Sequence, residues 1–206
     1  MKRYITDGKL AIIIVVAILV IDQIIKILVK TNMALDDSIH IADWFYIRFI
    51  ENNGMAYGMT FFNKLALSLF RLVAISVISY YVYKLVKRPQ PKGYIICLSM
   101  ILAGAMGNII DSMFYGLIFS PFGSGYASFL HGKVVDMFYF PIIETTWPQW
   151  VPQFGGKEFI FFSPIFNFAD ACISVGVVLL LLFYRKELEL IGTTMKGETK
   201  NEESHE

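Results

Sequence analysis

The chain has 206 residues, of which 56% are hydrophobic and only 17% are charged, and its mean hydropathy is +0.57. This composition is too apolar for an ordinary soluble domain of that length. The formal net charge of +1 gives no indication of a nucleic-acid or strongly acidic partner, and we expect none. The sequence therefore predicts a membrane protein.

Four apolar stretches have about the 20-residue length that a helix needs to cross a bilayer core. They cover residues 10–29, 65–86, 94–115 and 164–184. No small-residue cleavage site follows the first stretch, so we interpret it as a retained span and not as a removable signal peptide. Arg71 lies inside the second stretch, near enough to its front end for the side chain to reach the interface as an anchor.

The distribution of lysine and arginine predicts the orientation of these spans. Positive residues gather before the first span, between the second and third, and after the last: Lys2, Arg3, Lys9, Lys84, Lys87, Arg88, Lys92, Arg185 and Lys186. We therefore expect both termini to be cytoplasmic and the connections 30–64 and 116–163 to lie outside. Aromatic and β-branched residues in these connections predict a small extracytoplasmic β-sheet or loop cap.

The fold class that follows is an α-helical polytopic membrane protein. We expect residues 1–186 to form a single domain with four transmembrane helices. Residues 187–206 are charged and have no apolar periodicity, which predicts a disordered cytoplasmic tail.

Three carboxylates lie inside the apolar stretches. At about 1.5 Å per residue, Asp22 lies about 18 Å up from the inner end of the first span and Asp111 about 25 Å up the third. By the same rise, Asp170 lies about 9 Å below the outer end of the fourth. An aspartate that faces lipid at the centre of a helix costs about 2.5–3.5 kcal/mol. We therefore expect these side chains to meet in the outer half of the membrane, against one another or a hydrated cavity.

Helical spacing gives each carboxylate a polar neighbour on its own span. Asp22 and Lys26 are i,i+4 with the acid first, the favourable order for an ion pair. The other two carboxylates each follow an asparagine by three residues: Asn108–Asp111 and Asn167–Asp170. Plain structural roles would also explain these pairs. Asp22 with Lys26 would be a structural ion pair, and Asn167 would be the N-cap of the last helix.

Two mechanisms fit such a cluster, and the residues alone leave both open. Intramembrane aspartates serve small proton- or ion-coupled transporters. Two close carboxyl groups also support aspartic acid–base catalysis, in which one keeps its proton while the other activates water. A zinc site is not expected, because no Cys/His cluster has the required spacing. Cys97 and Cys172 lie at different depths, so we expect no disulfide.

Five motifs occur in order along the chain: VIDQIIK (20–26), ENNGMAYG (51–58), GAMGNIIDS (104–112), VVDMF (134–138) and FNFAD (166–170). Their order resembles that of the lipoprotein signal peptidase (signal peptidase II) family. The resemblance implies an intramembrane aspartic endopeptidase without metal or other cofactor. Such an enzyme removes the signal peptide from bacterial prolipoproteins just before a cysteine that carries diacylglycerol.

The resemblance also implies where the enzyme works and with what. Its location would be the bacterial cytoplasmic (inner) membrane, with the active site near the outer, periplasmic face. The partners would be the diacylglyceryl prolipoprotein substrate and membrane lipid, and we expect a monomer.

Position by position, the resemblance implies that Asp136 and Asp170 are the catalytic aspartates. It implies substrate-binding or supporting roles for five further residues: Asn52, Gly54, Asn108, Asp111 and Asn167. Asp22 and Lys26 would form the structural ion pair. Depth and spacing alone pair Asp111 with Asp170, because hydropathy puts Asp136 in an outer loop. The resemblance corrects that pairing, since it makes Asp111 a supporting residue and implies that Asp136 lies beside Asp170.

The protonation of this pair follows from simple electrostatics. Asp170 lies near a helix N-terminus, where the dipole favours its charge, so we expect it to be the ionised partner and Asp136 the protonated one. One carboxylate would deprotonate water while the other donates to the carbonyl oxygen and stabilises the tetrahedral intermediate. Such a dyad titrates as a pair.

Some features depart from the family pattern. Ser112 stands where the family has arginine, which leaves Lys133 or Arg48 as candidates for the missing cation. The segments 117–132 and 138–163 are longer than usual. We expect them to form an enlarged outer lid that shapes substrate choice.

Overall fold

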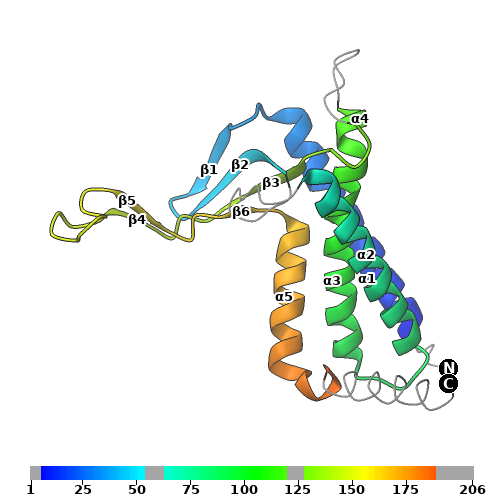
Figure 1. Cartoon of the computed structure of the whole chain (residues 1–206). Coiled ribbons are helices and arrows are strands. Elements are labelled where there is room, and N and C mark those ends of the chain that lie inside the picture. The colour runs from blue at the N-terminus through cyan, green and yellow to red at the C-terminus, as the bar shows by residue number, and fades with distance from the viewer. Residues whose placement is uncertain (1–5, 54–62, 120–127, 189–206) are drawn as a thin grey trace, which may run out of the picture.

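The computed structural model describes residues 6–53, 63–119 and 128–188 of the chain. Its long helices are α1 (Asp7–Asn32), α2 (Lys64–Leu85), α3 (Lys92–Ile110) and α5 (Phe168–Phe183). Helix α3 continues through a short π-helix, η2 (Asp111–Tyr115), into α4 (Gly116–Ile118). The long helices stand side by side as a bundle (Figure 1).

Within the described ranges, three helical segments are long and apolar enough to span a membrane: α1, α2 and the continuous run Lys92–Ile118. They coincide with the first three predicted stretches. Helix α5 is also apolar but has only 16 residues. It begins at Phe168 and not at residue 164, because Ile165 and Phe166 form a β-strand and Asn167 caps the helix.

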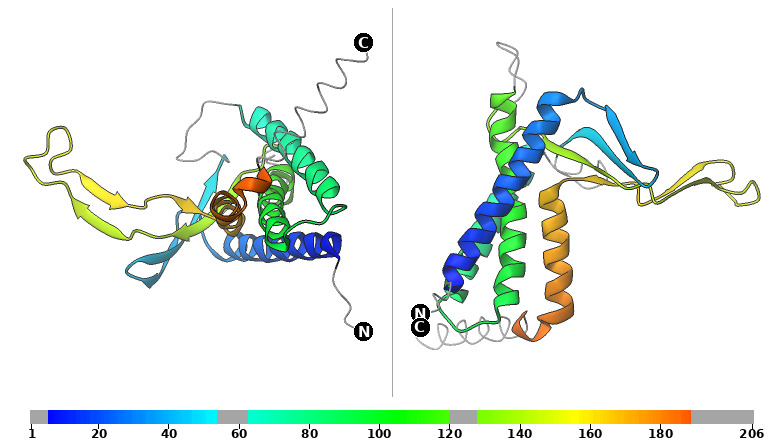
Figure 2. Two further views of the ribbon diagram at one scale, coloured as in Figure 1. Left: turned by 90° about the horizontal axis from the view of Figure 1, so that it is seen from below. Right: turned by 180° about the vertical axis from the view of Figure 1, so that it is seen from behind.

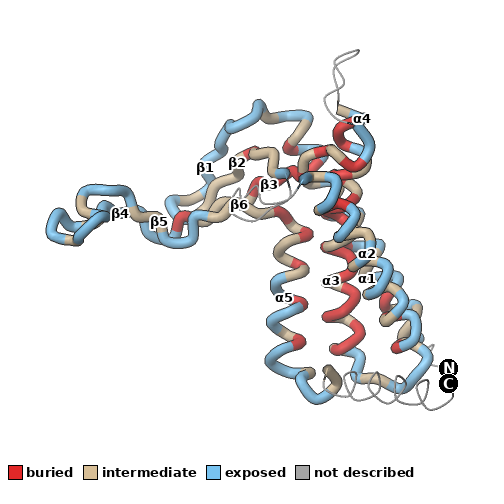
Figure 3. The backbone as a smooth tube through the Cα atoms, in the orientation of Figure 1, coloured by how far each residue is buried: buried red, intermediate tan, exposed pale blue. Residues whose placement is uncertain are grey.

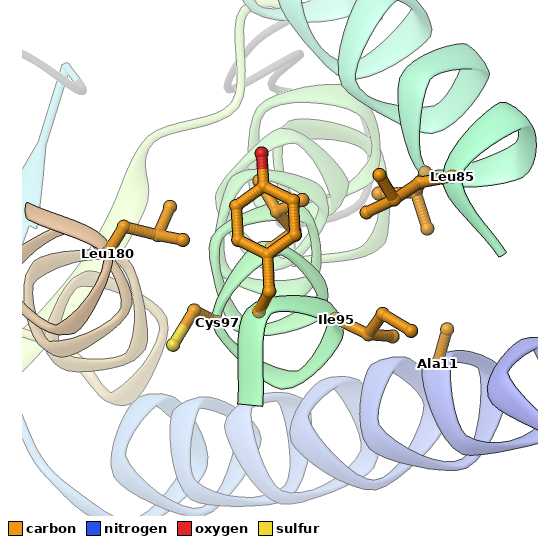
Figure 4. Packing of buried hydrophobic residues seen from close by; sticks show 8 residues of the cluster. Ala11, Leu85, Ile95, Cys97 and Leu180 are labelled. Carbon is orange, nitrogen blue, oxygen red and sulfur yellow. The ribbon is translucent and has the colours of Figure 1, made fainter. Parts of the chain in front are cut away.

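Helix α3 is the centre of the bundle. It packs against α1, α2 and α5 (Figure 2, left) and is the most buried of the long helices (Figure 3). Near its start, Tyr94 and Ile95 pack with Leu85 of α2, Ala11 of α1 and Leu180 of α5 (Figure 4). The outward faces of α1, α2 and α5 instead expose isoleucine, valine, leucine and phenylalanine side chains, as a lipid-facing surface does.

A four-stranded antiparallel sheet lies at one end of the bundle (Figure 1). Its strand order is β1 (Ser38–Ala42), β2 (Phe45–Asn52), β3 (Val134–Tyr139) and β6 (Ile165–Phe166). Val135 and Met137 of β3 are fully buried against the ends of α1 and η2. Side chains alternate along a strand, so Asp136 points away from this apolar cluster. The prediction of a small sheet in the outer connections is confirmed.

A second sheet is a separate hairpin of β4 (Ile143–Thr146) and β5 (Glu158–Phe161). Figures 1 and 2 show that it projects sideways from the four-stranded sheet. The expected lid over 138–163 is therefore wrong for this part of the chain, since the hairpin extends away from the helix ends instead of covering them. Part of the other extended segment, 120–127, lies outside the described residues, as does 189–206 of the expected tail.

The close contact between α3 and α5 gives a first prediction. A Cβ atom on Gly104 would lie 2.6 Å from Cγ1 of Ile173 and closer still to the carbonyl oxygen of Ala169. We expect Gly104→Ala to lower the free energy of unfolding by about 1–3 kcal/mol, because the backbone of α5 has to shift. Gly8→Ala is the matched control, since its Cβ meets only Val86 at 3.9 Å. Thermal unfolding in detergent measures both, and equal midpoints would contradict the prediction.

Candidate active site

Strand pairing brings Asn52 to Asp136. Ile50 of β2 lies opposite Asp136 of β3, and Asn52 lies two residues further along the same face. The amide Nδ2 of Asn52 donates to Oδ2 of Asp136 at 3.1 Å. Asp136 is only 1% exposed although it is a carboxyl group. The residue that hydropathy assigned to a loop is therefore part of a buried polar site.

The capping of α5 positions Asp170. Asn167 is the N-cap of α5, and its Oδ1 accepts a hydrogen bond from the backbone N–H of Asp170 at 2.9 Å. In return, Oδ2 of Asp170 accepts from the backbone N–H of Asn167 at 3.4 Å, which completes a capping box. The predicted N-cap is thus confirmed. Asp170 itself remains half-buried, in contrast to Asp136.

The side chain of Asn167 connects the two aspartates. Its Nδ2 donates to Oδ1 of Asp136 at 2.6 Å and to Oδ1 of Asn108 at 3.1 Å. Asn108 in turn donates from Nδ2 to Oδ1 of Asp170 at 2.7 Å. Asp136 and Asp170 are therefore held by the same amide group and lie in one hydrogen-bond network.

A buried ion cluster lies directly behind this network. The ammonium of Lys26 contacts Oδ2 of Asp22 at 2.9 Å, Oδ2 of Asp111 at 2.8 Å and Oδ1 of Asn108 at 3.0 Å. All three ammonium protons can thus be donated to protein acceptors. Asp22 also accepts from the backbone N–H of Ala169 at 2.9 Å, in the first turn of α5. The predicted ion pair is part of a cluster that connects α1, η2 and α5.

The two candidate partners of Asp170 make different contacts. Asp111 bonds to Lys26 and, at 3.3 Å, to the backbone N–H of Val135. These contacts favour Asp136 over Asp111 as the partner of Asp170, because Lys26 takes up the Asp111 carboxylate whereas Asp136 shares Asn167 with Asp170. Gly54, the remaining expected site residue, lies outside the described residues.

Two cationic side chains of α2, those of Lys64 and Arg71, lie near the site, which the sequence did not predict. Lys64 donates to Oγ of Ser112 at 3.2 Å and to the carbonyl oxygen of Asn53 at 2.8 Å. Lys64 is thus the cation at Ser112. Of the two expected candidates, Lys133 forms an ion pair with Glu51 at 3.4 Å, and Arg48 lies opposite Ser38 of β1.

Arg71 also differs from the expectation. Its guanidinium lies within electrostatic range of Asp170, Asp136 and Asp111, with Asp170 the strongest attraction. An interface anchor would point away from such a cluster. The position of Arg71 inside an apolar stretch could have indicated this, because ionisable residues in spans usually face the interior of the bundle.

Asp136 and Asp170 differ in their electrostatic surroundings. Burial, and then the negative charge of Asp170, raise the pKa of Asp136 to about 7. Hydrogen bonds from Asn52 and Asn167 and the charge of Lys26 offset part of that rise. Asp170 lies in the first turn of α5, where the helix dipole favours a negative charge. The site therefore contains a carboxyl group, that of Asp136, which retains a proton to higher pH than an ordinary aspartate.

Two unlike carboxyl groups held by amides at the end of an apolar helix bundle are the arrangement of a membrane-embedded acid–base enzyme. Residues 14–185 match the family model described as signal peptidase (SPase) II. The chain therefore belongs to the signal peptidase II family, whose members are aspartic peptidases.

Individual relatives agree with this assignment. A lipoprotein signal peptidase of Porphyromonas gingivalis is 49% identical over 96% of this chain and 94% of its own length. A second, from Amoebophilus asiaticus, is 36% identical over 82% of this chain and 75% of its own. A solved bacterial membrane enzyme is similar with a TM-score of 0.61 at 25% identity, covering 86% of this chain and 88% of that one. The transporter alternative is not supported by these comparisons.

The ion cluster gives the second prediction. Lys26→Met leaves the buried carboxylates of Asp22 and Asp111 without their shared counter-ion, and we expect a loss of about 3–5 kcal/mol in the free energy of unfolding. Lys87→Met removes an exposed charge and should change it by less than about 0.5 kcal/mol. Adding Asp111→Asn to Lys26→Met should recover part of the loss. Thermal unfolding in detergent tests this, and a midpoint for Lys26→Met equal to that of the control would refute it.

Proposed function

We propose that this chain removes the signal peptide from diacylglyceryl-modified bacterial prolipoproteins by cutting just before the lipidated cysteine. The proposal takes its substrate class from the curated relatives, which are named lipoprotein signal peptidases. The observation that carries its catalytic part is the sharing of Asn167 by Asp136 and Asp170. Two carboxyl groups in one network can exchange roles as acid and base.

In the proposed reaction, ionised Asp170 takes a proton from a water molecule, whose oxygen attacks the scissile carbonyl carbon. Asp136 donates its proton to the carbonyl oxygen and so stabilises the tetrahedral intermediate. When the C–N bond breaks, Asp170 returns its proton to the leaving amine and Asp136 recovers a proton from the collapsing intermediate. The partial exposure of Asp170 and the pKa of about 7 at Asp136 support this division of roles.

The remaining site residues would support the pair. Asn52, Asn108 and Asn167 hold the carboxyl oxygens, whereas Asp22, Lys26 and Asp111 form the rigid base beneath them. Arg71 would add positive potential near Asp136, which carries a negative charge once it has given up its proton. Gly54 would contact substrate, as the family resemblance implies.

The proposal includes a membrane topology. Helix α5 would be a fourth span in a single domain over 1–186, with both termini cytoplasmic. Its 16 residues give about 24 Å of helix, and the sheet at its start would complete the distance to the outer interface. The starts of α1 and α3 and the end of α5 lie at the opposite end of the bundle from the sheet (Figure 1). The active site would then face the periplasm of a monomeric inner-membrane enzyme.

Substitution of the two aspartates gives the third prediction. Asp136→Asn or Asp170→Asn should reduce cleavage of a diacylglyceryl prolipoprotein by at least about a thousandfold, because each removes one partner in proton transfer. Folding should persist. At position 136 the amide of Asn52 can flip to accept the new N–H. Cleavage by the purified protein is followed on gels, with unfolding midpoints measured alongside.

Two controls sharpen this test. His40→Ala changes an exposed titratable residue of β1 and should leave cleavage unchanged. A chelator should not reduce the wild-type rate. Full cleavage by both aspartate variants would overturn the assignment of the dyad, and a rate that requires added metal would count against the aspartic mechanism.

The raised pKa of Asp136 gives the fourth prediction. Because the protonated form of Asp136 is the acid, kcat/KM should fall about tenfold per pH unit above about pH 7. Asn52→Ala removes a donor that favours the ionised carboxylate, so the fall should move to higher pH. A purely structural role for Asn52 would lower the rate without moving the profile, and an unshifted profile would contradict the prediction.

A further inference from the structure

The β4–β5 hairpin has two chemically different faces. Cross-strand partners lie on the same face of an antiparallel pair. The register pairs Ile143 with Phe161 and Thr145 with Phe159, so three of these four side chains are large and apolar. The opposite face carries the pairs Glu144–Ile160 and Thr146–Glu158. We call these the aromatic face and the acidic face of the hairpin.

The apolar side chains of the hairpin are open to the surroundings. Ile143 and Phe161 are 53% and 52% exposed, and Trp150 in the connecting turn is 81% exposed. Trp147 packs edge-on against Phe159, with ring centroids 5.0 Å apart, which extends the aromatic face toward the tip. Isolated two-stranded hairpins are marginally stable in water, and a long hydrophobic edge promotes aggregation. This hairpin therefore requires an apolar surface to lie against.

The position of the hairpin points to one such surface. Strand β5 ends at Phe161, β6 follows at Ile165, and the apolar helix α5 begins at Phe168. The base of the hairpin is thus a few residues from the outer end of a lipid-facing helix. Figures 1 and 2 show the hairpin running sideways at that level, away from the bundle and over no other described part of the chain.

We propose that the β4–β5 hairpin lies in the headgroup region of the outer leaflet, with its aromatic face against the acyl chains and its acidic face in water. Aromatic side chains favour this interface, since their rings are amphipathic. Glu144 and Glu158 remain hydrated on the opposite face, and Lys157, which directly precedes β5, can reach lipid phosphate. The proposal uses the proposed membrane orientation but does not depend on the peptidase reaction.

Spin labelling of adjacent positions tests it on the full chain in bilayer nanodiscs. Cysteines are placed singly at Ile143 and Phe161 on the aromatic face and at Glu144 and Glu158 on the acidic face, with Cys97 and Cys172 replaced by Ala. Each is labelled with a nitroxide, and collision with oxygen is compared with collision with a water-soluble nickel chelate. We expect the oxygen-to-nickel ratio to be several-fold higher at 143 and 161 than at 144 and 158. The thermal unfolding midpoint of each labelled variant, compared with that of the unlabelled protein, reports on folding.

Every other pattern overturns the proposal. Equal nickel access on both faces would mean that the hairpin stands in water. Exclusion of both reagents from the aromatic face would mean that a protein partner or second copy covers it. Trp44→Phe, which leaves the hairpin strands intact, provides a second measurement. The remaining tryptophans of this variant, Trp147 and Trp150, both lie in the hairpin. Vesicles with brominated acyl chains should quench their fluorescence at least twofold. Unchanged fluorescence would contradict the proposal even if a labelled variant failed to fold.

Discussion

The buried ammonium of Lys26 is the interaction on which the rest of the site depends. Two carboxylates without exposure to water would not stay ionised and close together unless a cation lay between them. Oδ1 of Asp22, Oδ2 of Asp111 and the amide of Asn108 carry this constraint outward. They accept from the backbone N–H of Ala169 in α5, accept from that of Val135 beside Asp136, and donate to Asp170, respectively. One ion cluster thus determines where the first turn of α5 and strand β3 can lie.

The neutral side-chain amides of Asn108 and Asn167 lie between this cluster and the carboxyl groups of Asp136 and Asp170. If lysine or arginine replaced Asn167, a direct cationic contact would lower the pKa of Asp136 and keep it ionised at neutral pH. The Asn167 amide instead holds Asp136 in place with a hydrogen bond that favours ionisation far less than a full charge. The same residue caps α5, so helix formation and the alignment of the two carboxyl groups are coupled through one side chain.

The sequence predicted the parts of this molecule that depend on local composition. Hydropathy located α1, α2 and α3, and spacing identified the Asp22–Lys26 pair and the Asn167 cap. It failed for Asp136, because strand pairing with β2 and not helical depth brings that residue to the site. It also missed Lys64 and Arg71, since hydropathy does not show which side of a span faces the bundle. The order of the motifs corrected the error at Asp136 but gave no indication that Lys64 and Arg71 lie near the site.

Asp136 and Asp170 lie on two elements that suit different surroundings. Asp136 lies on a strand of the sheet at the bundle end, whereas Asp170 lies in the first turn of an apolar helix. Their meeting point is therefore the boundary at which backbone hydrogen bonding changes from strand ladders to a helix suited to lipid. Under the proposed function, water would reach the half-buried Asp170 there, while the signal helix and acyl chains of the substrate would remain in the bilayer. A hairpin lying along the same boundary would hold the sheet, and with it Asp136, at that level.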